Sequence, residues 1–476
     1  MRSRTARVAI IVSALTSVAT AAALVTTGAS ATPGTGGGTG PDRLIHGSPG
    51  AGDSLFPHAG NGGYDVRHYG LTLRYSPTDG VLHGIDRIRL RTHQPLDTFN
   101  LDLSRLHVDS VRVDGGTAHW RRSGTELRVA PGHRLARATT HLVVIRYHGR
   151  PHTWIDQDGS EDGWIQTPDG ADAVNEPLGA MTWFPVNNTP ADKASYDLSI
   201  TVPRGLTGIS NGRLRSHRSH AGLTTWVWRE RDQMASYLVT ATIGRFRMIT
   251  GRGPRGVPIR SFVDPSMAGA AAVAHRVAGV LRVWSRDFGP YPFSSAGIII
   301  DRADYGYALE VQTRPVFPFV PDQSTLVHEL AHQWYGDSVG LRDWSDIWLN
   351  EGFATYAEWL WRARSHPGAP HRILRRLYRD NGPHSSLWSP PPGRPGSGAH
   401  LFGTPVYARG AMALQVLRER IGTPDFFTVL RTWARQHRQG HGTTAQLRRL
   451  AARVSGQRLG SVFWTWIYHD GKPARL

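Results

Sequence analysis

Cysteine is absent from the 476-residue sequence. Its absence excludes disulfide bonds, cysteine nucleophiles and metal sites that are built from thiolates. Hydrophobic residues make up 39% of the chain and aromatic residues 9%, so a chain of this length can bury a stable core without disulfides. If the protein binds zinc, the ligands must therefore be histidine and carboxylate side chains.

Lysine is scarce as well, because only Lys193 and Lys472 accompany the many arginines among the 55 basic residues. The formal net charge is +18. Such an extreme arginine bias is typical of a genome-wide codon preference, and no recognisable nucleic-acid-binding module accompanies it. The sequence therefore predicts no nucleic-acid partner, and it leaves open a weak attraction to an anionic cell surface.

Long apolar runs are also missing, except at the N-terminus. There an apolar run at positions 8–25 follows three arginines and precedes the small residues Ala29-Ser30-Ala31. This pattern predicts a cleaved secretory signal peptide over residues 1–31, an extracellular location, and no stable membrane insertion after cleavage. An uncleaved membrane anchor is the alternative, since the run is long enough to span a bilayer.

The rest of the chain divides by its hydrophobic periodicity. Residues 32–62 are rich in Gly, Pro, Thr and Ser, which predicts a flexible linker. Residues 63–255 alternate apolar and polar side chains between turn residues, which predicts an antiparallel, β-sandwich-like domain. Residues 256–476 have mostly helical spacing with a short buried strand, which predicts a helical domain with a small sheet. The expected fold class is thus multi-domain, β followed by α+β.

One predicted helix carries a pattern typical of zinc chemistry, "VHELAH". His328 and His332 are four residues apart, so both imidazoles project from the same face of the helix. Glu329 lies about 100° around the helix from His328, beside a metal ion rather than on it, and can take a proton from water there. By itself the pattern is a modest signal, because two histidines on an amphipathic helix are often only packed or surface residues.

A third ligand makes the zinc prediction specific. A catalytic zinc ion usually has three protein ligands and one open position. Glu351, 19 residues after His332, lies on the next predicted helix, which can pack antiparallel and direct it to the same point. Alone, Glu351 is explained as an acid that favours a helix N-terminus. Together with His328 and His332 it predicts a site for one zinc ion per chain.

The spacing of "HELAH" and "NEGFA" resembles that of the gluzincin peptidases of the aminopeptidase N type. Segments 176–203, 288–293 ("FGPYPF") and 343–359 ("DWSDIWLNEGFATYAEW") are similar to that family too. Thermolysin itself is a more distant relative, with Ser-Asp where this chain has Ala354-Thr355. The resemblance implies a thermolysin-like catalytic domain over residues 256–476. It also implies a secreted, zinc-dependent aminopeptidase that acts on peptides. The chain resembles the short bacterial form of the family, which lacks a C-terminal helical domain.

The resemblance also implies roles for individual residues. Zinc polarises the peptide carbonyl and makes water more acidic, and Glu329 acts as general base and then acid. Tyr407 of "VYARGAM" matches the family's oxyanion-stabilising tyrosine, with Arg409 where lysine is usual.

The substrate amine has its own set of matching residues. Glu310, within "YALEV", and Glu176 match the glutamates that bind the free α-amine, and Ala308 is retained in the substrate-binding strand. Val311 departs from the family pattern in that strand, which puts its shape in doubt.

The chain continues for only 69 residues after Tyr407, so we expect a more open site than in capped relatives, and less restriction to short peptides. Two alternatives remain: a secreted, thermolysin-like zinc endopeptidase, and a non-catalytic relative with the same fold. The preferred N-terminal residue, the physiological substrate and the oligomeric state do not follow from the sequence.

Overall fold

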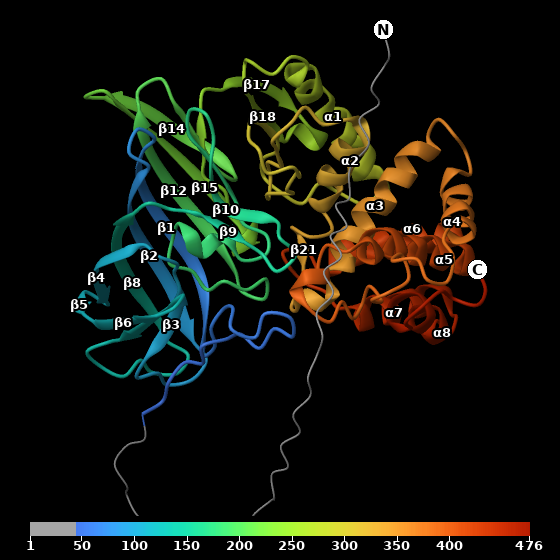
Figure 1. The fold of residues 1–476 in the computed structure, drawn as a ribbon, viewed down its shortest axis with the longest axis horizontal. Coiled ribbons are helices and arrows are strands. Elements are labelled where there is room, and N and C mark those ends of the chain that lie inside the picture. Colours follow the sequence, from blue (N-terminus) through green and yellow to red (C-terminus); the bar gives the residue numbers. More distant parts are fainter. Residues whose placement is uncertain (1–43) are drawn as a thin grey trace, which may run out of the picture. The chain divides into compact units, whose positions relative to one another are not determined.

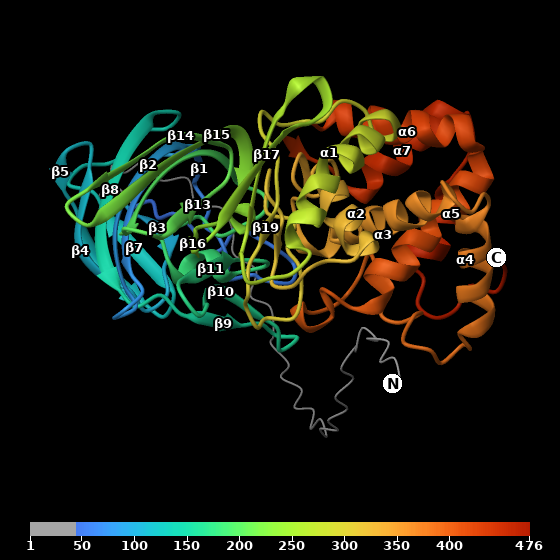
Figure 2. The same cartoon turned by 90° about the horizontal axis from the view of Figure 1, so that it is seen from above.

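The computed structural model describes residues 44–476. The predicted signal peptide at 1–31 and the first part of the predicted linker, at 32–43, lie outside the described residues. Strands β1–β16 gather in one half of residues 44–476 and helices α1–α8 in the other (Figures 1 and 2). This arrangement confirms the predicted fold class, a β-rich domain followed by a mostly helical domain with a small sheet. Within 44–476, no helix combines the length and apolar character needed to cross a membrane.

An eight-stranded sheet forms the main layer of the β-rich half. Its side chains alternate between the core and the solvent, as the sequence periodicity predicts. All neighbouring strands are antiparallel except β1 and β12, which pair in parallel. In spatial order the strands are β14 (Arg213–His220), β15 (Leu223–Ala235), β12 (Lys193–Pro203), β1 (Tyr64–Ser76), β2 (Val81–Thr92), β8 (Thr140–Gly149), β4 (His107–Val113) and β5 (Gly116–Thr117).

Two smaller sheets complete the β-rich half, with five and three strands. In the eight-stranded sheet, a Cβ atom at Gly84 of β2 would lie 2.1 Å from the ring of Tyr147 in the neighbouring strand β8. Only glycine at this position therefore lets the buried ring pack across the strand. The strands, in spatial order, are β13 (Thr207–Ile209), β16 (Thr242–Gly244), β11 (Ala171–Val174), β10 (Glu161–Gln166) and β9 (Thr153–Ile155) in one sheet, and β3 (Phe99–Asp102), β7 (Glu126–Ala130) and β6 (His119–Ser123) in the other.

The helical half begins with a four-stranded sheet, β17 (Arg247–Arg252), β18 (Pro258–Val263), β19 (Ile299–Ile300) and β20 (Val316–Phe317). The predicted domain boundary at residue 255 falls between β17 and β18, which pair as an antiparallel hairpin. A further pair joins β21 (Val339–Gly340) and β22 (Gly440–His441). The helices are α1 (Ala270–Asp287), α2 (Gln323–His332), α3 (Trp348–Ala363), α4 (Ala369–Asp380), α5 (Gly410–Ile421), α6 (Thr423–Gln436), α7 (Thr444–Ser455) and α8 (Gly460–Phe463).

Residues 44–62 correct the prediction of a flexible linker over 32–62. Asp53 accepts hydrogen bonds from the backbone N–H groups of Leu55 and Trp344, and Phe56 packs edge-on against the Trp344 ring. The segment therefore fastens the β-rich half to the helical half. The Gly- and Pro-rich composition predicts flexibility only where the few other side chains find no partners, and here Asp53 and Phe56 find partners distant in the sequence.

Arg314 is a buried anchor between the two halves. Its guanidinium donates to the carbonyl oxygens of Ser210 and Gly212 in the β-rich half and of Arg260 in β18. It also lies over the ring of Trp228, 4.7 Å from the centroid. Burial lowers its pKa to about 10, so the side chain stays charged at neutral pH. The planar, five-donor guanidinium suits a position that faces several carbonyl groups at once.

The first prediction concerns this anchor. Replacing Arg314 with methionine (Arg314→Met) removes the guanidinium that donates to three backbone carbonyl groups, and we expect the free energy of unfolding to fall by about 3 kcal/mol or more. Chemical denaturation measures the change. Arg282→Met, on the exposed face of α1, is the matched control and should change the stability little. Equal effects of the two substitutions would contradict the anchoring role.

Candidate active site

Helix α2 presents its two histidines to a cavity because its apolar face is packed into the core. The Asp322 side chain caps the helix by accepting from the Thr325 N–H at 2.8 Å. Leu326 and Leu330 are buried in the core. His328 and His332, one turn apart, both line the cavity. The helix ends at His332, and the chain then turns into the loop that precedes β21.

The hydrogen bonds of the two imidazoles fix which nitrogen of each ring faces the cavity. His332 Nδ1 donates to the carbonyl oxygen of Tyr335 at 3.0 Å, and His328 Nδ1 donates to the Glu358 carboxylate at 2.8 Å. The Nε2 atoms of His328 and His332 then face the same Glu351 oxygen, at 3.2 and 3.5 Å. Three electron-pair donors therefore converge from α2 and α3, and a cation must lie among them for this arrangement to be stable.

The geometry of this group fits zinc. Ligand atoms about 2.0–2.1 Å from a tetrahedral zinc ion lie roughly 3.3 Å from one another. The distances of 3.2 and 3.5 Å from Glu351 to the two histidines match this value. The three ligand atoms lie within 4.8 Å of one another. Glu358, on α3, holds His328 in its metal-binding orientation.

The converging groups line a cavity of about 280 Å³. All eight residues singled out in the sequence are among its lining residues, so the structure brings together segments that are as far apart in the chain as Glu176 and Tyr407. The sequence assigned no role to the five remaining lining residues. The complete lining is Asp158, Ser160, Glu176, Tyr307, Ala308, Leu309, Glu310, His328, Glu329, His332, Glu351, Phe402 and Tyr407.

The cavity concentrates negative charge away from water. Burial raises the pKa of Glu329 to about 8, although the nearby histidines oppose the shift. Burial and the neighbouring Glu310 carboxylate hold the pKa of Glu176 well above its usual range. Burial lowers the pKa of His332, but the charges of Glu310 and Glu351 outweigh burial and raise it to about 9. The whole group therefore attracts positive charge, whether a proton, a metal ion or an ammonium group.

The segment around Glu310 is held like an edge strand. Leu309 and Val316 exchange backbone hydrogen bonds at 3.0 and 2.8 Å. Gln333, directly after "HELAH", donates from its side chain to the Glu310 carbonyl at 3.2 Å and accepts from the Thr313 N–H at 2.8 Å. Val311 is fully buried and does not line the cavity, so its departure from the family pattern leaves the lining of this strand intact.

Tyr407 and Arg409 share a π-helical turn, Pro405–Arg409, but point to different places. The Tyr407 ring lies 6.2 Å from the His328 ring, at the cavity. Arg409 is fully buried outside the cavity and donates to the carbonyl oxygens of Thr465 and Trp466 at 2.9 and 3.0 Å. Arg409 therefore attaches the turn that contains Tyr407 to the C-terminal segment. It does not add positive charge to the cavity.

Sequence reasoning missed five lining residues: Asp158, Ser160, Tyr307, Leu309 and Phe402. Asp158 and Ser160 belong to the connection between β9 and β10, which has no fixed spacing to the zinc ligands. Tyr307 hydrogen bonds to the carbonyl oxygen of Glu161 in β10 and so joins this connection to the segment of Glu310. Only Tyr307 and Leu309 had a usable signal, since they flank Ala308.

Two family models match the chain. Residues 321–466 match the peptidase family M1 domain, and residues 168–238 match the peptidase M1 N-terminal domain. Among curated relatives, Aminopeptidase 2 of Candida albicans is 22% identical over 448 residues, which is 85% of this chain and 47% of the relative. The chain thus spans about half the length of that relative.

Solved structures match over nearly their full length. The M1 zinc metallopeptidase of Deinococcus radiodurans is 28% identical, with a TM-score of 0.82, over 90% of this chain and 99% of that one. A mutant of the M1 zinc metallopeptidase of Deinococcus radiodurans bound to a Tyr-Ser-Ala substrate gives a TM-score of 0.81 at 28% identity, over 90% of this chain and 100% of that one. With its converging histidines and glutamate, the chain belongs to peptidase family M1, the gluzincin zinc metallopeptidases of the aminopeptidase N type.

Proposed function

We propose that the protein is a zinc-dependent aminopeptidase that removes the N-terminal residue of peptides. One observation carries the proposal. Glu176 and Glu310 are 5% and 2% exposed, each has a carboxylate oxygen without a hydrogen-bond partner among residues 44–476, and both line the cavity that contains the zinc-binding group. Buried carboxylates without partners require a cation, and a substrate with a free α-ammonium group supplies one.

The rest of the mechanism follows from the lining residues. His328, His332 and Glu351 would hold the zinc ion, which would supply a Lewis acid for the peptide carbonyl and for the attacking water. The Glu329 carboxylate accepts the proton of the attacking water and passes it to the departing amine. The Tyr407 hydroxyl donates a hydrogen bond to the oxyanion that develops on the substrate.

Amine recognition determines which bond is cut. When Glu176 and Glu310 hold the α-ammonium group, the first peptide carbonyl of the substrate is the one brought to Glu329 and the zinc ligands. An endopeptidase must accept chain on both sides of the cleaved bond, and buried unpaired carboxylates at one end of the cavity disfavour a neutral peptide chain there. The aminopeptidase relatives and the bound tripeptide of the Deinococcus protein also support the exopeptidase.

We further propose that the enzyme is exported and acts outside the cell. The support is the signal-peptide pattern of residues 1–31, with its arginines, apolar run and small-residue cleavage site.

The assigned catalytic roles predict that replacing either Glu329 or Tyr407 lowers kcat, for two different reasons. Glu329→Gln should keep zinc and lower kcat by about 10²–10⁴-fold, because the general base is gone. Tyr407→Phe should lower kcat by about 10²–10³-fold, because one oxyanion donor is gone. Turnover of a panel of aminoacyl chromogenic substrates, with and without a chelator, together with metal analysis, measures both. Glu419→Gln, outside the cavity on α5, is the control; full activity of Glu329→Gln would refute its role.

Amine recognition predicts a strict requirement for a free N-terminus. Acetylating the substrate amine should abolish turnover, since the acetylated amine is neutral and leaves both carboxylates unpaired. Glu310→Gln should lower kcat/KM for the free peptide by about 10–100-fold, the value of one charge-assisted hydrogen bond. Equal turnover of acetylated and free peptides would indicate an endopeptidase instead.

Export predicts a defined mature N-terminus. Protein recovered from the culture medium of the producing cells should begin at Thr32, which N-terminal sequencing or intact mass measures. Membrane-bound protein that retains residues 1–31 would show the alternative, an uncleaved anchor.

A further inference from the structure

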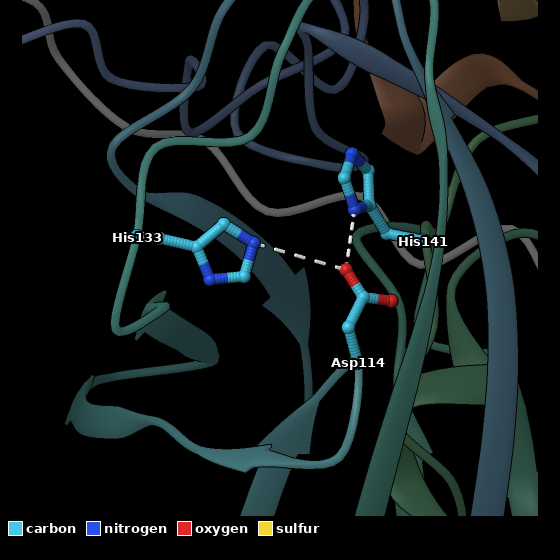
Figure 3. A group of neighbouring side chains, drawn as sticks. All are labelled: Asp114, His133 and His141. Atoms are coloured by element: carbon cyan, nitrogen blue, oxygen red, sulfur yellow. Dashed lines mark hydrogen bonds and ion pairs between the residues drawn. The ribbon is translucent and has the colours of Figure 1, made fainter.

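A second group of metal-binding side chains lies on the β-rich half, away from the catalytic cavity. Asp114 is in the turn between β4 and β5, His133 is in the connection between β7 and β8, and His141 is near the start of β8 (Figure 3). One Asp114 oxygen, Oδ2, lies 2.7 Å from His141 Nδ1 and 3.9 Å from His133 Nε2. One nitrogen of each histidine and this oxygen all lie within 4.8 Å of one another.

The hydrogen bonds of Thr139 determine the orientation of His141. The Thr139 hydroxyl donates to the carbonyl oxygen of Ala136 at 2.6 Å, so its oxygen can only accept from His141 Nε2, also at 2.6 Å. The ring proton is therefore on Nε2. A neutral His141 then directs the electron pair of Nδ1 at the Asp114 oxygen. Two acceptors 2.7 Å apart need a cation between them, either a proton or a metal ion.

Asp114 is oriented just as firmly. Its Oδ1 accepts from the Leu142 N–H at 2.8 Å, and its own N–H donates to the Leu142 carbonyl at 2.9 Å. These bonds hold the residue in the left-handed conformation, with φ of 50°. Oδ1 is thus engaged, and Oδ2 is directed to both histidines. Partners of this kind, which orient a ligand from behind, are characteristic of metal sites.

We propose that Asp114, His133 and His141 form a second metal site, for a divalent ion of the Zn²⁺, Ni²⁺ or Cu²⁺ class. Two imidazoles and one carboxylate are the donors that these ions prefer. Ligand atoms around zinc lie roughly 3.3 Å apart, so the Asp114 oxygen would move about 0.6 Å from His141 towards His133. His133 can adjust as well, because its side chain is 59% exposed. The ion would cross-link the β4–β5 turn to both ends of the β7–β8 connection.

The competing explanation is a simple ion pair between a protonated His141 and Asp114. In that case His133, at 3.9 Å, contributes nothing to a bound cation. Replacing His133 therefore separates the two explanations, because it leaves the Asp114–His141 pair intact. The chain also offers a matched control. Asp109 has one histidine at 2.7 Å (His148) and another at 3.8 Å (His107), but Asp109 and His148 are each 41% exposed.

The experiment counts metal ions on the purified holoenzyme, with its catalytic zinc in place. The protein is equilibrated with Zn²⁺ or Ni²⁺, separated from free ions, and analysed by mass spectrometry for metal per chain. We expect two equivalents for the wild type and for His107→Ala, and one for His133→Ala. Added metal should also raise the melting temperature of the wild type but not of His133→Ala, since only binding to the folded state stabilises it. Peptidase activity should be the same in all three proteins.

Three outcomes would overturn the proposal. One equivalent on the wild type would show an ion pair only. Two equivalents on His133→Ala would place the second ion elsewhere. A loss in His107→Ala equal to that in His133→Ala would show nonspecific binding to exposed imidazoles. None of these outcomes bears on the catalytic zinc, which remains as the first equivalent in every protein.

Discussion

The site depends on one electrostatic constraint: buried carboxylates must be balanced by cations. Glu176, Glu310, Glu329 and Glu351 share one small cavity with two imidazoles whose Nε2 atoms face the same oxygen. In water-excluded surroundings such a group is stable only when positive charge enters it. In the proposed function, a metal ion balances the charge at the histidine end of the cavity and a substrate ammonium group balances it at the glutamate end. Charge balance thus connects metal binding with the choice of the N-terminal peptide bond.

The framework around this group is held by buried side chains that donate to backbone carbonyls. Arg314 joins the two halves, Arg409 fixes the turn of Tyr407, and Gln333 holds the strand of Glu310. Lys193 does the same for the loop after α2, donating to the carbonyl of Asp337 at 2.8 Å. A Cβ atom on Gly340 would lie 2.7 Å from Lys193, so the space admits a slender side chain only. This crowding gives a physical reason for lysine at this position in an arginine-rich chain.

The two histidine–carboxylate groups follow the same logic in different surroundings. In each, a hydrogen bond behind the imidazole fixes its proton on one nitrogen and leaves the other to a cation. The catalytic group is buried and has distances that suit zinc. The group at Asp114 is partly exposed and needs a small rearrangement, so water and protons compete there more strongly. Burial and preorganisation therefore separate a strong site from a weaker one.

The sequence by itself determined what depends on local spacing. The four-residue interval placed His328 and His332 on one helical face, and alternation assigned the strand-rich and helical halves. Only the tertiary structure decided what depends on contacts between distant segments: the parallel pairing of β1 with β12, the anchoring of residues 44–62, the direction of the buried Arg409 away from the cavity, and the entry of Asp158 into the cavity. The reason is physical, because periodicity records which face of an element is buried but not which partner covers it.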